Sequence, residues 1–97
     1  MKAIAYLWVP LDKNELIKQT TRVRDYCISQ NIRDVKFYSD ALGKKKMFEL
    51  MLRHFEKGDR DTLIIYDKSL LSIDEIRKIE GFGVRIISVR GEDKSYA

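Results

Sequence analysis

The sequence is poor in cysteine, histidine and proline, with one of each among its 97 residues: Cys27, His54 and Pro10. A single cysteine cannot form an internal disulfide or supply a cysteine-rich zinc site. No stretch approaches the roughly 18 apolar residues of a membrane span. The short apolar run over 3–9 ends at Pro10 rather than at a small-residue cleavage site, so it does not resemble a signal peptide. We therefore expect a cytoplasmic protein without a membrane partner.

Several cofactor and catalytic motifs are also missing. No G-x-G-x-x-G sequence follows the first apolar run, and no phosphate-binding Walker sequence occurs. His54 has no serine or cysteine obviously paired with it, and the serines near the expected strand ends are typical of turns and helix caps. The sequence therefore predicts no cofactor and no metal.

The charge is mildly basic. Lysine and arginine number 19 against 15 aspartates and glutamates, which gives a net charge of +4. Such an excess permits contact with nucleic acid but does not require it. The length is that of one domain, which we place over 1–97 with a flexible polar tail from 90.

Hydrophobic periodicity predicts an alternation of strands and helices. The continuous apolar run before Pro10 indicates a buried strand, and the apolar run over 62–67 indicates a central one. Ser72 and Glu75 have the spacing of a capping box at the start of a helix. We expect strands over 3–9, 35–39, 62–67 and 84–89, and helices over 14–31, from about 48 to 57 and from about 73 to 79.

The apolar spacing also predicts which helix faces are buried. In the first helix the core face comprises residues three and four apart, with Asp12 as a candidate cap. Ile73, Ile76 and Ile79 have the spacing of a short third helix. The first-helix set is Leu16, Thr20, Val23 and Cys27, with Ile17 and Tyr26 alongside.

This order of elements predicts a small three-layer α/β/α domain with a mainly parallel four-stranded sheet. Ligands of such sheets bind beyond the carboxyl ends of the strands. Asp40, Asp67 and Asp12 fall there, which suggests an Asp-dependent Mg²⁺ or phosphoacceptor domain of the receiver kind. Against this, Pro10 and Leu11 directly follow the first strand, where a receiver-like site has acidic residues.

Five segments together resemble the catalytic domain of the serine recombinases, the resolvase/invertase family. They are "AIAYLWV", "ELIKQTTRVRDYCISQNI", "VKFYSDALGKKK", "DTLIIYDKSLLS" and "GVRIISV". The likeness covers nearly the whole chain in order and spacing. In that family a Y-x-R-V-S pattern after the first strand supplies the serine that attacks the DNA phosphodiester, and a D-R-L-x-R pattern supplies arginines that stabilise the phosphate in flight.

Position by position, the resemblance divides into a scaffold half and a chemical half. Trp8 stands where the first arginine belongs and Pro10 where the serine belongs, while Leu70 and Ile73 stand at the arginines of the second pattern. Proline has no nucleophile, and apolar side chains cannot hold a phosphate dianion. We therefore expect no strand transfer. The positions that fit the pattern are Tyr6, Gln19, Asp40, Tyr66, Asp67, Leu71 and Ser72.

The resemblance implies a catalytically inactive domain that acts by binding in a mobile element. The replaced residues form either a partner-binding apolar surface or a closed cleft. Lys44, Lys45 and Lys46 are the candidates for phosphate contact, with a solvated basic loop as the alternative. Partners would be DNA, a second copy, a full-length recombinase or another protein. Family members continue into a long helix and a helix-turn-helix domain. This sequence has neither, so we expect no autonomous sequence-specific DNA binding from it.

Overall fold

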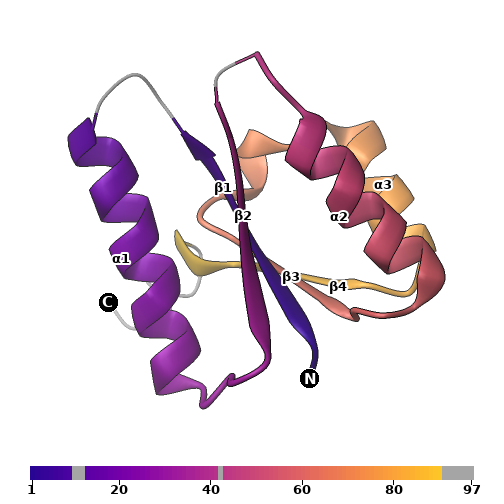
Figure 1. The fold of residues 1–97 in the computed structure, drawn as a ribbon, viewed down its shortest axis with the longest axis horizontal. Coiled ribbons are helices and arrows are strands. Elements are labelled where there is room, and N and C mark those ends of the chain that lie inside the picture. Colours follow the sequence, from indigo (N-terminus) through magenta and orange to yellow (C-terminus); the bar gives the residue numbers. More distant parts are fainter. Residues whose placement is uncertain (10–12, 42, 91–97) are drawn as a thin grey trace.

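The computed structural model describes residues 1–9, 13–41 and 43–90, and the backbone alone at Val9. Pro10, Asp12 and residues 91–97 of the predicted tail lie outside the described residues. Strands and helices alternate along the chain (Figure 1). The elements are β1 (Ala3–Val9), α1 (Lys13–Ser29), β2 (Val35–Ala41), α2 (Lys46–Lys57), β3 (Thr62–Ile65), the 3₁₀ turn η1 (Lys68–Leu70), α3 (Ile73–Gly81) and β4 (Arg85–Ser88).

The four strands form one parallel sheet in the order β2-β1-β3-β4. The apolar strands β1 and β3 occupy its centre, as the sequence predicts for segments that are apolar on both faces. Helix α1 covers one face, and α2 and α3 cover the other (Figure 1). The predicted three-layer α/β/α fold is confirmed. No helix among the described residues is long and apolar enough to cross a membrane.

Alternation along β1 divides the core into two layers. Ala3, Ala5 and Leu7 pack with the buried side chains of α1, whereas Ile4 and Tyr6 pack with those of α2 and α3. Because the register pairs Leu7 with Ser39 and Trp8 with Asp40, the same alternation continues on β2. Side chains at the carboxyl end of the sheet therefore belong to one face or the other by residue parity, and Trp8 faces α2 and α3.

One residue of the predicted apolar face of α1 is exposed instead. Ile17 is 62% exposed, because the buried residues of α1 are Gln19, Val23 and Cys27, and Ile17 lies roughly 200° around the helix from Gln19. Ile73, the first residue of α3, is also 69% exposed, whereas the buried residue of that helix is Ile79. Apolar spacing alone therefore does not decide which side chains of a helix are buried.

The helix ends follow local sequence rules. Gly58 ends α2 with φ 81°, a left-handed conformation that glycine adopts without strain. At α3 the Ser72 side chain accepts from the Glu75 N–H, and the Glu75 side chain accepts from the Ser72 N–H. The predicted capping box is therefore present. Strand β2 runs two residues beyond its predicted end, and β3 and β4 are each shorter than predicted.

Candidate functional site

Asp40 is the centre of the hydrogen bonding at the carboxyl end of the sheet. Its side chain is 4% exposed and accepts from the Tyr6 hydroxyl at 2.8 Å. It also accepts from the backbone N–H groups of Met47 and Phe48 at 2.9 and 2.8 Å. These amides belong to the first turn of α2, so Asp40 joins β2, β1 and the start of α2. This carboxylate has a structural role.

The hydrogen bonds set the charge states of both partners. Burial acts to raise the pKa of Asp40, but the bonds from Met47, Tyr6 and Phe48 outweigh it and hold that pKa below its ordinary value. Burial and the adjacent Asp40 carboxylate both raise the pKa of the Tyr6 hydroxyl. Tyr6 therefore remains a neutral donor at neutral pH, and Asp40 remains an ionised acceptor.

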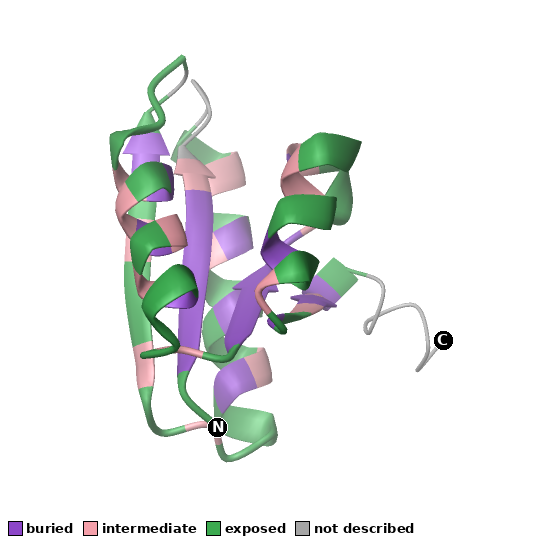
Figure 2. Cartoon of the chain, turned by 90° about the vertical axis from the view of Figure 1, so that its right-hand side faces the viewer, coloured by how far each residue is buried: buried purple, intermediate pink, exposed green. Residues whose placement is uncertain are grey.

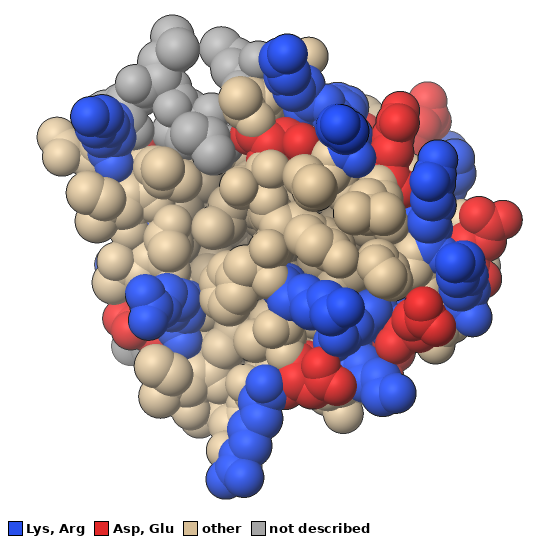
Figure 3. Space-filling model, in the orientation of Figure 1, with Lys and Arg blue, Asp and Glu red and all other residues tan. Residues whose placement is uncertain are grey.

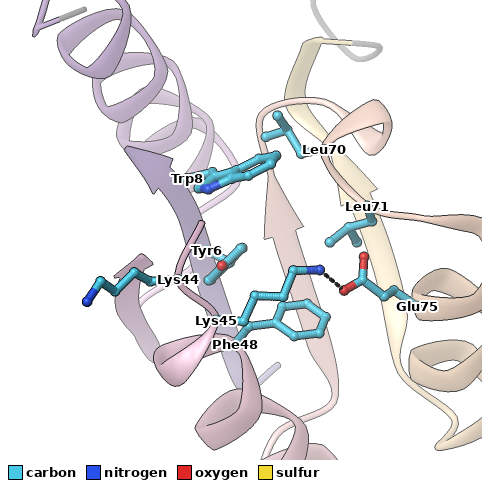
Figure 4. A pocket seen from close by; sticks show the side chains of 8 residues that line it. All are labelled: Tyr6, Trp8, Lys44, Lys45, Phe48, Leu70, Leu71 and Glu75. Carbon is cyan, nitrogen blue, oxygen red and sulfur yellow. Dashed lines mark hydrogen bonds and ion pairs between the residues drawn. The ribbon is translucent and has the colours of Figure 1, made fainter. Parts of the chain in front are cut away.

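A narrow cleft lies beside this pair, where Trp8 and Leu70 meet over the carboxyl ends of β1 and β3 (Figure 4). Its cavity volume is about 10 Å³, close to the space of one water molecule. Trp8 and Leu70 are each half-buried, so they fill most of the cleft and still present a face to solvent. The lining residues are Tyr6, Trp8, Lys44, Lys45, Phe48, Leu70, Leu71 and Glu75.

One lysine of this cleft is neutralised. Lys45 forms an ion pair with Glu75 of α3 at 2.5 Å, and its amine also lies 5.4 Å from the centre of the Phe48 ring. Burial acts to raise the pKa of Glu75, but the bonds from Lys45 and Ser72 lower it overall. Figure 4 shows Lys45 directed across the cleft and Lys44 directed away from it. The rim therefore offers no unpaired cation aimed inward among the described residues.

The three predicted phosphate-binding lysines do not form one cluster. Lys44 points outward at the rim, Lys45 is paired with Glu75, and Lys46 begins α2 beside a separate hollow that it lines with Arg53. The backbone N–H groups of Met47 and Phe48, just after these lysines, donate to Asp40.

The predicted degenerate surface is brought together in part. Trp8, near the end of β1, and Leu70, in η1 after β3, line one cleft. Ile73 does not line that cleft and is exposed on the first turn of α3. Pro10 lies outside the described residues. The surface that the structure supports is thus Trp8 and Leu70, with Leu71 and Phe48 beneath them.

Asp67 also has a structural role. It accepts from the Ser69 N–H at 3.1 Å, which caps η1, and from the Arg90 guanidinium at 2.8 Å. The bond from Ser69 lowers the pKa of Asp67, burial opposes this, and Arg90 lowers it further. No group of three potential metal-ligating side chains occurs among the described residues. Asp40 and Asp67 were both candidates for an Asp-dependent site. Each accepts hydrogen bonds from backbone N–H groups at the start of a helix or turn, which accounts for its position.

Sequence reasoning missed two sets of contacts. Glu75 was identified only as a capping residue, since nothing local connects it to Lys45, 30 positions away. His54, interpreted as a lone helix residue, lies 3.1 Å from the Tyr38 hydroxyl and 3.4 Å from an Asp59 carboxylate oxygen. The spacing from His54 to Asp59 spans the end of α2, so only the left-handed turn at Gly58 brings the two together.

Of the comparisons with known proteins, the one with solved structures identifies the fold. Neither family models nor curated proteins match the sequence. Among solved structures, the C-terminal catalytic domain of ISC1926 TnpA, an IS607-like serine recombinase, matches 92% of this chain with a TM-score of 0.76 and 20% identity, over 67% of that chain. The fold is that of a serine recombinase catalytic domain.

Two further structures of this fold are similar. The C-terminal catalytic domain of IS1535 TnpA, also IS607-like, has a TM-score of 0.66 and 16% identity, covering 90% of this chain and 70% of that one. The first open reading frame of transposon ISC1904 from Sulfolobus solfataricus P2 has a TM-score of 0.70 and 18% identity, covering 92% and 67%. At these identities the likeness establishes the fold of the serine recombinase-like domain, and its chemistry rests on its own residues.

Proposed function

We propose that this serine recombinase-like domain carries out no strand transfer and acts by reversible binding. The observation that carries the proposal is the filled cleft, in which Trp8 and Leu70 meet and Lys45 is neutralised by Glu75. Phosphoryl transfer requires cations aimed at the developing charge on the phosphate. An apolar cleft with a neutralised rim does not supply them, and Pro10 has no hydroxyl to act as the nucleophile.

The half-buried Trp8 supports binding at this end of the sheet. A fully buried tryptophan would act only as filling, whereas Trp8 and Leu70 keep part of their surface in solvent. Tryptophan is enriched among the residues that dominate binding energy at protein interfaces. We therefore propose a protein partner at the Trp8–Leu70 face, such as a recombinase or a second copy of this chain.

Lys44 and Lys46 are the proposed phosphate contacts for weak, non-specific DNA binding. Both are exposed, and neither has an ion pair among the described residues, whereas Lys45 does. Two neutralised phosphates correspond to a log-log salt slope of about −1.8 on duplex DNA. The setting that we propose is recombination or its regulation in a mobile element, in the cytoplasm. It is supported by the fold, by the transposon source of one similar structure and by the free, buried Cys27.

The test is DNA binding across a salt series, measured by fluorescence anisotropy with a labelled duplex. The double variant Lys44→Ala/Lys46→Ala should remove most of the binding and flatten the slope. The matched control is Lys45→Ala/Glu75→Gln, which removes a lysine and the charge that neutralises it, and should leave the slope nearly unchanged. If the wild-type chain is not retained on DNA at low salt, the DNA part of the proposal is wrong.

A further inference from the structure

The outer strand β2 has one edge with no neighbour in the described part of the chain. It pairs with β1 along its whole length, from Val35 to Ala41, and it is the terminal strand of the order β2-β1-β3-β4. In Figure 2 this outer strand is mostly exposed or intermediate, while the inner strand beside it is buried. A seven-residue open edge is a template for pairing with another extended segment.

The register shows which backbone groups face that edge. The Ala3 N–H donates to the Asp34 carbonyl at 2.8 Å, so Asp34 directs its carbonyl toward β1. Successive residues of a strand direct their N–H and C=O groups to opposite edges. The backbone groups of Lys36 and Tyr38 therefore also face β1. Val35, Phe37 and Ser39 therefore direct their backbone groups outward, and no described strand accepts them.

The same strand presents an apolar side chain next to a groove. Phe37 is paired with Ala5, so it faces the α1 side of the sheet, where it is 43% exposed. Two hollows of about 450 and 200 Å³ lie between α1 and β2, and Phe37 and Arg24 line both. The other lining residues are Leu7, Thr20, Cys27, Ile28, Ile32 and Val35.

Two cations near this edge are unpaired in the described part of the chain. Arg24 and Lys36 are exposed and have no ion pair among the described residues. Of the nearby carboxylates, Asp34 is paired with Arg60 and Asp40 is buried. No acidic residue lines either hollow. In Figure 3 the surface between α1 and β2 is largely uncharged, and the mixed charges gather toward α2.

These charges decide what kind of segment fits. A second copy paired through the same edge would bring a second Arg24 and a second Lys36 to it, and like charges facing each other across a strand pair destabilise the pair. An acidic segment would place carboxylates near the same two cations. Charge complementarity thus favours a foreign acidic strand over self-pairing.

We propose that the free edge of β2 binds an extended acidic peptide segment of a protein partner by strand addition. The segment pairs with the outward backbone groups of Val35, Phe37 and Ser39. An apolar side chain covers Phe37, and carboxylates reach Arg24 on one face and Lys36 on the other. This surface lies away from the Trp8–Leu70 cleft and does not rest on the function proposed there.

The test uses the peptide DEVEIEVD, blocked at both ends, titrated into the isotope-labelled chain and followed by NMR. The amide signals of Val35, Phe37 and Ser39 should shift together and gain protection from exchange with solvent. Two control peptides should bind much less: the version with lysine at every acidic position, and a version N-methylated at alternate residues, which keeps the charge but cannot form the ladder.

Charge-reversed variants test the assignment of the cations. Arg24→Glu/Lys36→Glu should weaken the acidic peptide roughly tenfold and strengthen the lysine peptide. Arg77→Glu/Lys78→Glu on α3 makes the same change in net charge and should leave the affinity within about twofold. The proposal is overturned if the edge amides do not respond, if the N-methylated peptide binds equally well, or if the chain dimerises through β2 without peptide.

Discussion

At the scale of single residues, the carboxyl end of the sheet depends on Asp40 for structure rather than for chemistry. Three donors from two elements converge on its carboxylate, and it is almost completely buried. The sequence predicted a strand that contains Tyr6 and placed Asp40 directly beyond the strand over 35–39. It could not show that they bond to each other, because that contact depends on the register between β1 and β2 across 34 residues.

Stability should depend on the charge of Asp40. Since its pKa is lower in the folded chain than its ordinary value of 3.8, it contributes stability that is present above about pH 4 and is lost as the pH falls through the folded-state pKa. Asp40→Asn should lower the free energy of unfolding at pH 7 by about 2 kcal/mol. It should also make the free energy of unfolding fall less as the pH is lowered. Urea unfolding from pH 3 to 7 measures both.

The control for that series is Tyr6→Phe. It removes one of the three donors and should cost about 1 kcal/mol while keeping an acid-dependent loss. The pKa values of Asp61, Asp67 and Glu75 are also lowered, so some acid sensitivity should remain in every variant. Identical acid profiles for Asp40→Asn and the wild-type chain would show that Asp40 does not carry this role.

At the scale of elements, the helix ends were predicted well from local sequence, and the burial of individual helix side chains was predicted less well. The capping box at Ser72 and the glycine end of α2 depend only on neighbouring residues, and both are present. Ile73 and Ile17 fit the apolar period but point to solvent, because burial depends on where the sheet lies relative to each turn. Lys44, Lys45 and Lys46 do not form one cluster, because α2 begins within this run.

The α3 cap should contribute measurable stability. Ser72→Ala leaves the Glu75 N–H without its acceptor and should lower the free energy of unfolding by about 1 kcal/mol. Lys78→Ala is the matched control, because its side chain is exposed and has no partner among the described residues. It should change stability by less than about 0.5 kcal/mol. Equal effects of the two substitutions in urea unfolding would contradict the capping role.

At the scale of the whole molecule, the order of strands and helices was predictable because parallel α/β topology has few solutions once the alternation is known. The strand order β2-β1-β3-β4 also determines which loops meet at the carboxyl edge. What the sequence could not predict was the interior of the cleft. Lys45 precedes α2 and Glu75 lies in α3, so the two become partners that neutralise the rim only when α2 and α3 pack on the sheet.

The whole-molecule claim is that a recombinase fold has been retained for reversible binding, without strand transfer. The most direct test is to incubate the chain with end-labelled DNA and separate the products on a denaturing gel, with an active serine recombinase as the positive control. The account predicts unmodified DNA and free protein only, even where native conditions show a complex at low salt. A labelled strand that remains attached to the protein after denaturation would contradict it.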